Sequence, residues 1–225
     1  MQLAIDTATD LASVALVDGQ RLLFELTWRC EQNHSRELLP SLNNLFRQHG
    51  LKWETVSGII AALGPGSYNG LRVGVSTAKG LAFSLGVPVV GISSLEVAAY
   101  QHAATGLPVC AVFNAGREEV AAAIYQKKRG RWQQLVAEHI TTFDALCTRI
   151  TGRTVFAGDF AGALADLLKQ RLGRKAVIPP VAGLVRRAAF LAELGQARLA
   201  GGGDDLATLQ PLYLRRPAIT RRRHR

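Results

Sequence analysis

Cysteines and long apolar runs are scarce in this sequence, and each scarcity narrows the class of protein. Cys30, Cys110 and Cys147 are odd in number and show no C-x-x-C spacing, so we expect core thiols and neither a disulfide framework nor a zinc site. No apolar run reaches the ~20 residues of a membrane span. The chain enters a strand pattern at Leu3 without a signal-peptide pattern. We therefore expect a cytoplasmic protein without a membrane partner.

The usual residue patterns of catalysis are also absent. No two histidines lie three or four residues apart, which excludes the helical metal pair, and there is no G-x-S-x-G nucleophile turn. Gly66 and Gly70 are not followed by the Lys-Ser/Thr pair of a Walker loop. The sequence therefore predicts no catalytic residue and no metal ligand.

The formal net charge of +10 is concentrated in a few segments. Residues 215–225 hold six arginines and no acid, so the rest of the chain carries only +4. A second basic cluster, residues 127–131, resembles a hairpin tip. Such segments suit nucleic acid or another polyanion, but they are also typical of a solvated loop and tail, which is the interpretation we favour. The candidate RNA contacts in the tail are Arg221, Arg222, Arg223 and Arg225.

The chain is organised around residues 64–86, GPGSYNGLRVGVSTAKGLAFSLG. This stretch follows an apolar run and then carries helical periodicity, which predicts a buried strand, a tight turn and a helix. Gly66 and Ser67 in the turn are candidate anion contacts. The helix has a stripe of small residues at every fourth position, and two interpretations of it remain open: packing against this chain's own sheet, or contact with another subunit. The stripe consists of Gly70, Gly74, Ala78 and Ala82.

The predicted elements form the order βββαβαβα twice. In the first half we expect strands at 3–5, 12–17, 22–28, 56–63 and 87–91 and helices at 35–49, 70–85 and 94–104. In the second half we expect strands at 109–113, 120–126, 133–140, 154–157 and 176–178 and helices at 143–150, 160–172 and 181–200. The sequence thus predicts an α/β fold with two actin-like subdomains, 1–104 and 105–204, and residues 205–225 joining the first.

Two such subdomains facing one another would form a cleft where the turns 6–9 and 114–117 meet. This is the layout of actin-like and sugar-kinase-like ATPases. Asp6 could then hold magnesium through water, with Thr7 and Thr9 touching phosphate, but an Asx turn between strands explains Asp6 equally well. The matching turn of the second half carries the neutral Asn114, so the acidic pair of a phosphotransferase looks incomplete.

Several segments together resemble the bacterial TsaB family, also called YeaZ. They are LAIDTATDLASVAL, NHSRELLPSLNNLF, GPGSYNGLRVGVSTAKGLAFSLGVPVVGISSLE and PLYLRRPAIT. The resemblance covers most of residues 1–104. The second half is similar only in layout, with residues 158–159 and 211–215 as local matches.

The resemblance implies a protein of the actin/sugar-kinase/Hsp70 class without catalytic activity of its own. Such proteins form a heterodimer with TsaD and act with the ATPase TsaE. Together these proteins transfer threonylcarbamoyl to the adenosine beside the anticodon of tRNAs that read codons beginning with A. A homodimer is also implied, and the contacts with either partner are expected on the two N-terminal helices. The implied interface residues are His34, Leu38, Leu42, Leu45, Gly70, Leu71, Gly74, Val75, Ala78, Lys79 and Ala82.

The chain departs from the family pattern at two turns. Tyr68 and Asn69 replace the usual Phe-Thr, and residues 114–117 replace the usual Asp-Ala-Arg turn, which weakens any expectation of a metal-bound nucleotide in the cleft. We therefore expect no cofactor on this chain alone, with ATP or ADP reserved for the junction with the partner. The alternative is an autonomous small-molecule phosphotransferase of the same fold.

Overall fold

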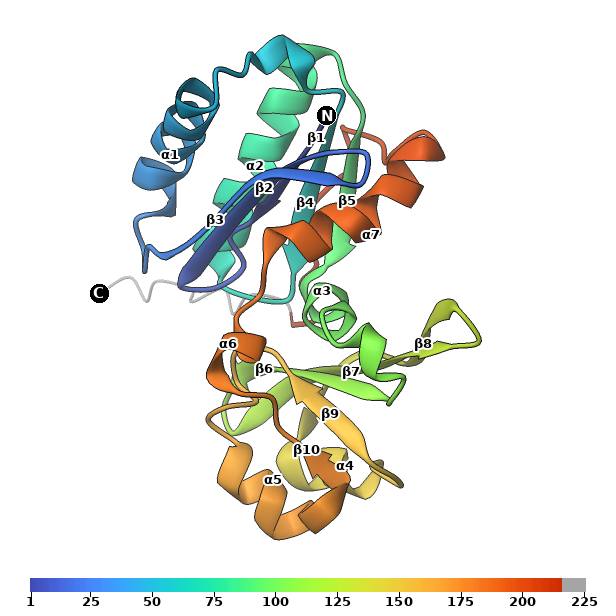
Figure 1. Ribbon diagram of the computed structural model, residues 1–225. Helices are drawn as coiled ribbons and strands as arrows, with labels where there is room; N and C mark the ends of the chain where they lie inside the picture. The colour runs from blue at the N-terminus through green and yellow to red at the C-terminus, as the bar shows by residue number, and fades with distance from the viewer. Residues whose placement is uncertain (216–225) are drawn as a thin grey trace, which may run out of the picture.

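The computed structural model describes residues 1–215 and contains two five-stranded sheets (Figure 1). The first sheet has the order β3-β2-β1-β4-β5. Its strands are β1 (Gln2–Asp6), β2 (Leu11–Asp18), β3 (Arg21–Arg29), β4 (Gly58–Gly64) and β5 (Val89–Ser93). The first three strands are antiparallel, and β4 and β5 run parallel to β1. This part of the fold agrees with the sequence prediction.

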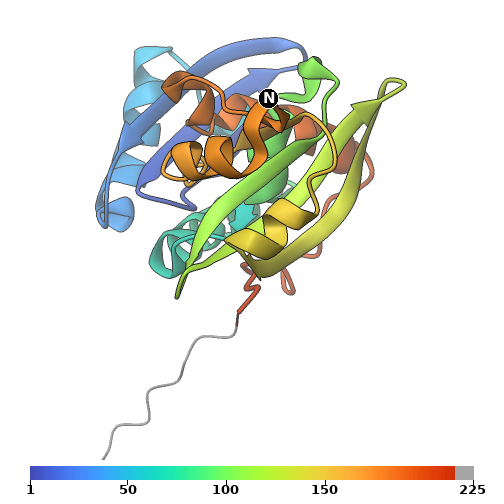
Figure 2. The same cartoon turned by 90° about the horizontal axis from the view of Figure 1, so that it is seen from below.

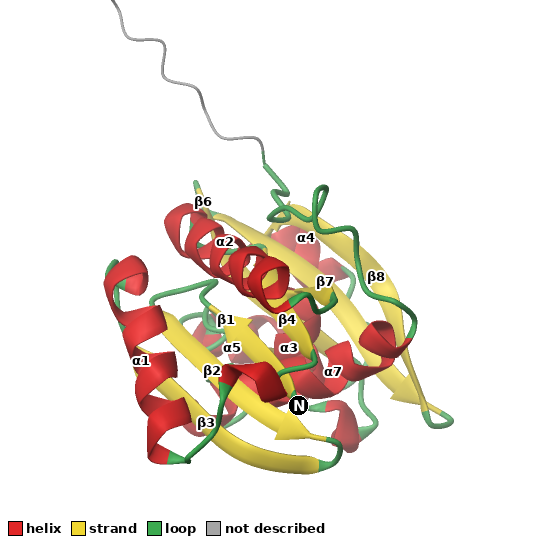
Figure 3. Ribbon diagram, turned by 90° about the horizontal axis from the view of Figure 1, so that it is seen from above, coloured by secondary structure: helices red, strands yellow, loops and turns green. Residues whose placement is uncertain are grey.

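Helices cover both faces of the first sheet. Because side chains alternate along a strand, Leu3 and Ile5 of β1 face α1 (His34–Gln48) and α2 (Tyr68–Leu85), whereas Ala4 faces the opposite side. That opposite side is covered by α7 (Ala188–Ala200), which comes from the far end of the chain. Figure 3 shows the first sheet with α1 and α2 on one side and α7 on the other.

The second sheet repeats the topology of the first, with the order β10-β9-β6-β7-β8. Its strands are β6 (Val109–Gly116), β7 (Glu119–Lys128), β8 (Arg131–Thr142), β9 (Thr154–Ala157) and β10 (Ala176–Val177). One face packs against α4 (Phe143–Thr148) and α5 (Ala165–Leu172), and the other packs against α3 (Ser94–Tyr100), which lies between the two sheets. This duplicated arrangement confirms the predicted two-subdomain, actin-like α/β class.

Four predicted boundaries differ from the structure. The helix expected at 160–172 begins only at Ala165. The helix expected at 181–200 is interrupted: α6 (Val181–Leu184) and α7 are separated by three residues, of which Val185 and Arg187 are extended. Because α7 packs on the first sheet, the chain leaves the second subdomain well before the expected boundary at residue 204. The turn expected at 114–117 lies later, since β6 continues to Gly116.

The C-terminal segment returns along the first subdomain. Asp204 donates its backbone N–H to the carbonyl oxygen of Val89 (2.7 Å), and Leu212 donates to that of Leu63 (2.7 Å). Leu209 is buried in the core beneath α2. The predicted RNA contacts Arg221, Arg222, Arg223 and Arg225 lie outside the described residues. No helix among residues 1–215 is long and apolar enough to cross a bilayer.

Candidate functional site

The turns of the two subdomains line one hollow of about 800 Å³ at the mouth of the cleft between them. Thr9 and Asp10 come from the turn after β1, and Phe113 and Asn114 come from the end of β6. Gly66 and Ser67, before α2, lie on the same wall. Of the two turns expected to meet in a cleft, 6–9 and 114–117, Thr9 and Asn114 line this hollow.

Asp6 ends β1 at the base of this cleft and is almost fully buried, with 1% of its surface exposed. Its Oδ1 accepts a hydrogen bond from the backbone N–H of Ala8 at 2.9 Å, which is the Asx turn that the sequence allowed. A buried carboxylate also needs a cationic partner, because its hydration is lost. Arg186 supplies that partner: its Nε donates to Asp6 Oδ2 at 2.9 Å.

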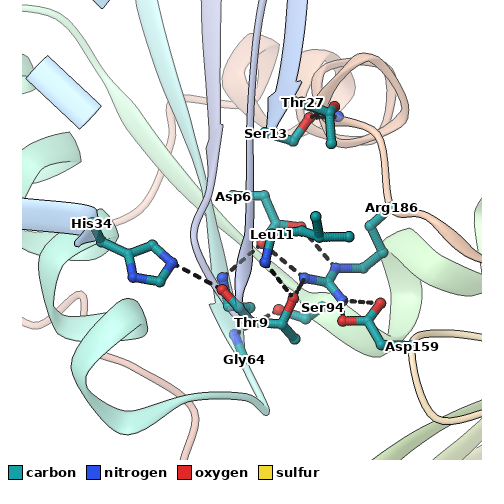
Figure 4. Close-up of polar contacts among 12 residues, drawn as sticks. Asp6, Thr9, Leu11, Ser13, Thr27, His34, Gly64, Ser94, Asp159 and Arg186 are labelled. Atoms are coloured by element: carbon teal, nitrogen blue, oxygen red, sulfur yellow. Dashed lines mark hydrogen bonds and ion pairs between the residues drawn. The ribbon is translucent and has the colours of Figure 1, made fainter. Parts of the chain in front are cut away.

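Arg186 is itself buried and connects both subdomains (Figure 4). Its Nη1 donates to both carboxylate oxygens of Asp159, each at 2.8 Å, and its Nη2 donates to Thr9 Oγ1 at 3.1 Å. Its guanidinium carbon lies 4.9 Å from the centre of the Phe113 ring, a cation–π distance. Burial alone would lower the pKa of Arg186, but the adjacent Asp6 and Asp159 carboxylates outweigh it and raise that pKa.

This arrangement decides what the cleft can hold. Both oxygens of Asp6 are engaged by Arg186 or by the backbone, and a guanidinium occupies the position where a carboxylate would otherwise hold magnesium. Among residues 1–215 there is no group of three histidine, cysteine or carboxylate side chains arranged to bind a metal ion. The residues therefore do not fit a metal-bound nucleotide at the base of the cleft.

Thr7 does not face the cleft, in contrast to the predicted phosphate contact. It is buried, and its Oγ1 donates to the carbonyl oxygen of Gly70 at 2.7 Å. A Cβ added at Gly70 would collide with the Thr7 carbonyl oxygen, and one added at Gly74 would collide with Thr7 Oγ1. The small-residue stripe thus brings α2 close to β1 of the same chain, which is the first of the two interpretations left open by the sequence.

Most residues of the predicted interface set are buried within this chain. His34 is 3% exposed, and its Nε2 donates to the carbonyl oxygen of Thr9 at 2.8 Å, so it positions the turn after β1. Lys79 is half-buried and donates to the carbonyl oxygen of Leu209 at 3.0 Å, while Leu45 is half-buried against the core. The other predicted interface residues are buried within this chain: Leu38, Leu42, Gly70, Leu71, Gly74, Val75, Ala78 and Ala82.

The outer surface of the same two helices carries different apolar side chains. Phe83 of α2 is 79% exposed, and Leu39 of α1 is 44% exposed. Between the helices lies a groove of about 580 Å³. The groove is lined by Leu39, Asn43, Trp53, Glu54, Val56, Leu81, Ser84 and Leu85. The helices expected to form an interface therefore keep an exposed apolar surface, although it consists of other residues.

Sequence reasoning missed Arg186 and gave Asp159 no role in the cleft. Arg186 lies 180 residues from Asp6 in the chain, and nothing in the local pattern around it differs from that of a cation on a helix surface. One signal could have indicated a role for Asp159. The pair 158–159 directly follows β9, at the edge where the carboxyl ends of the parallel strands β6 and β9 lie together.

The fold and the cleft define a class of protein: a two-subdomain, actin-like α/β chain in which Arg186 bridges carboxylates of both subdomains at the base of the cleft. A family model described as "TsaD: tRNA N6-adenosine threonylcarbamoyltransferase" matches residues 29–159.

Curated relatives and solved structures identify the family. A tRNA threonylcarbamoyladenosine biosynthesis protein TsaB from Bacillus subtilis is 32% identical over 95% of this chain and 93% of the relative. TsaB from Escherichia coli is 33% identical over 75% of each chain. YeaZ from Pseudomonas aeruginosa superposes with a TM-score of 0.75 at 26% identity, covering 94% of this chain and 99% of that one. The chain belongs to the TsaB family, also called YeaZ.

Proposed function

We propose that this chain is a non-catalytic subunit that binds and activates TsaD in the biosynthesis of threonylcarbamoyladenosine in tRNA. TsaD would transfer the threonylcarbamoyl group to the adenosine beside the anticodon of tRNAs that read codons beginning with A. TsaE would act as the ATPase of the same system. The relatives of this chain that are named tRNA threonylcarbamoyladenosine biosynthesis protein TsaB support a role in this process.

The observation that carries the non-catalytic role is the Asp6–Arg186–Asp159 network. A phosphotransferase cleft requires acidic groups that are free to hold a metal-bound nucleotide. Here the Asp6 carboxylate is buried and engaged by Arg186, and the opposite wall carries the neutral Asn114, near the end of β6. The same observation argues against the alternative, an autonomous small-molecule phosphotransferase.

The outer surface of α1 and α2 is the proposed contact with TsaD. Phe83 and Leu39 are large apolar side chains that a monomer would leave in water, and the groove between the helices offers a complementary recess. A homodimer through the same surface would compete with the heterodimer. ATP or ADP would be confined to the junction with the partner, where Gly66, Ser67 and Thr9 at the mouth of the cleft remain accessible.

A substitution at Phe83 tests this proposal directly. Phe83→Asp should weaken binding to TsaD at least tenfold, because an unpaired carboxylate would have to be buried in an apolar contact. The variant should keep the thermal stability of the wild type, since the side chain is exposed. Leu167→Asp is the matched control, because Leu167 is 49% exposed on α5 of the other subdomain. Affinity is measured by titration calorimetry, and threonylcarbamoyl transfer is measured at limiting subunit concentration.

The transfer activity lost with Phe83→Asp should return when the variant is supplied in excess. Wild-type affinity in this variant would contradict the interface. ATP turnover by the lone wild-type chain that is lost in Asp6→Asn would contradict the non-catalytic role and favour the phosphotransferase.

A further inference from the structure

The positive charge of the described chain is unevenly divided between the subdomains. Residues 1–104 contain seven Lys and Arg against eight Asp and Glu, whereas residues 105–204 contain fourteen against eight. Because α7 packs on the first sheet, residues 185–204 are counted with the first subdomain, which then holds ten cations against ten acids, while residues 105–184 hold eleven against six. The first subdomain is therefore neutral and the second is strongly basic. A charge difference of this size between halves of one chain points to a polyanionic partner for the basic half.

The topology of the second sheet collects many of these cations along one border. Strands β6, β9 and β10 are parallel, and β7 runs antiparallel to β6, so the tip of the β7–β8 hairpin lies on the same border where β9 and β10 begin. We call this border the basic edge. Its cations are Lys127, Lys128, Arg129 and Arg131 at the hairpin tip, Arg153 before β9, and Arg174 and Lys175 before β10.

All seven side chains of the basic edge are available to a ligand. Each is exposed, and none forms an ion pair or a side-chain hydrogen bond with any residue between 1 and 215. Arg153, Arg174 and Lys175 border a hollow of about 560 Å³ beside β10. From β10 to β8 there are four strand spacings, so the edge is roughly 19 Å wide.

The hairpin tip keeps its charge at the expense of local stability. Lys128 pairs directly with Arg131 across the strands, and like charges in that position destabilise a hairpin. Arg129 has φ +50° and Gly130 has φ +78°, a two-residue turn in which Asn or Gly is favoured at the first position. Folding therefore does not explain why three cations occupy this turn.

We propose that the basic edge is a surface that binds the phosphate backbone of tRNA. The described cations of the edge have no exposed large apolar side chain among them, whereas a membrane anchor or a protein interface needs an apolar centre. A row of unpaired cations matches a ligand whose charge is spread along a chain, as in RNA. The choice of tRNA rests on the proposed function.

The position of the basic edge is compatible with simultaneous binding of TsaD. Figure 1 shows α1 and α2 at the upper left, in the first subdomain, and the β7–β8 hairpin projecting to the right beside the second sheet, and the view from below in Figure 2 shows the hairpin projecting from the body. The RNA would therefore not compete with the proposed apolar contact of Phe83 and Leu39.

The test measures tRNA binding by the assembled complex of this chain with TsaD as a function of salt. One variant removes two of the four tip cations (Lys128→Ala with Arg131→Ala), and another removes the three cations of the hollow (Arg153→Ala, Arg174→Ala and Lys175→Ala). The control is Arg21→Ala with Arg117→Ala. Both of these arginines are exposed, and Arg117 lies at the opposite border of the same sheet. The probe is an unmodified tRNA transcript, and assembly with TsaD is verified by sedimentation before RNA is added.

The slope of log affinity against log salt is negative, and the tip variant should reduce its magnitude by about 1.4 to 1.8, the expected effect of losing two phosphate contacts. Its affinity should fall roughly tenfold near physiological salt, and equally for tRNAs of different sequence. The control should keep the wild-type slope. Unchanged slopes in both edge variants of an assembled complex would overturn the proposal. Polyglutamate, an acidic peptide chain, serves as a second probe: edge variants that lose binding to polyglutamate but keep their affinity for tRNA would also overturn it. If the wild-type chain does not assemble with TsaD, the proposed function fails instead.

Discussion

At the scale of single residues, the contact between the two subdomains at the base of the cleft rests on one buried cation, Arg186. Desolvating a guanidinium is costly, and Arg186 compensates by donating to two carboxylates and one hydroxyl in a planar fork. The residue joins β1 of the first subdomain to the end of β9 in the second. Stability and the orientation of the subdomains are therefore coupled at this position.

Replacing Arg186 should be strongly destabilising. Arg186→Met leaves the Asp6 carboxylate buried without a cation, which should lower the free energy of unfolding by about 3–5 kcal/mol in urea titrations. Asp6→Asn in the same chain should recover part of the loss, because an amide carries no charge. The control is Arg29→Met: the Arg29–Asp10 pair spans 4.0 Å with both side chains about two-thirds exposed, so its loss should cost less than about 1 kcal/mol.

Of this network, the sequence indicated only the Asx turn of Asp6, as one of two interpretations. Asp6 follows an apolar strand and precedes a polar turn, so its place at the end of β1 and its Asx turn were accessible to local reasoning. Arg186 was not, because residues 185–187 contain neither proline nor glycine and the apolar periodicity continues from Leu184 to Leu191. A break in a helix that is imposed by a distant carboxylate leaves no trace in the local pattern.

At the scale of elements, α2 shows how a stripe of small residues can be interpreted in two ways. The spacing of Gly70 and Gly74 requires close approach to some neighbour, and sequence alone does not say which one. In the structure the neighbour is Thr7, and the Thr7–Gly70 hydrogen bond fixes the distance between β1 and α2. The proposed contact with TsaD lies instead on the outer surface of the helix, where Phe83 is exposed.

Two glycines of α2 should respond oppositely to substitution by alanine. Gly74→Ala places a methyl group against Thr7 Oγ1 and should lower the free energy of unfolding by roughly 1–3 kcal/mol. A Cβ at Gly80 meets nothing within 4 Å, so Gly80→Ala should raise it by up to about 1 kcal/mol through helix propensity alone. Denaturant unfolding of the lone chain measures both changes. A Gly74→Ala variant that is stable but fails to bind TsaD would show instead that the stripe of small residues contacts the partner subunit.

At the scale of the whole molecule, the two subdomains are not consecutive stretches of the chain. The first subdomain is completed by α7, whose Gly195 allows close contact with Ile60 of β4, and by the segment that carries Leu209. The duplicated βββαβαβα order was predictable because each half has its own hydrophobic periodicity. The crossing of α7 to the first sheet was not, since its apolar residues suit either sheet equally.

This crossing predicts that residues 1–104 do not fold alone. Without α7, the face of the first sheet formed by Ala4, Ala15 and Ile60 would be exposed to water, although each is fully buried in the intact chain. The isolated fragment should aggregate or lack a cooperative thermal transition by circular dichroism. Co-expression with residues 185–215, which supply α7 and the returning segment, should restore a soluble complex with such a transition.

The matched control pairs residues 1–104 with a 185–215 fragment carrying Leu191→Asp. Leu191 is fully buried against the first sheet, so an aspartate there would place an unpaired charge in the contact. This pair should remain insoluble. A fragment 1–104 that melts cooperatively by itself, or a rescue that tolerates the aspartate, would show that α7 only covers a subdomain that is already stable. The first subdomain would then end where the sequence alone placed its boundary, at residue 104.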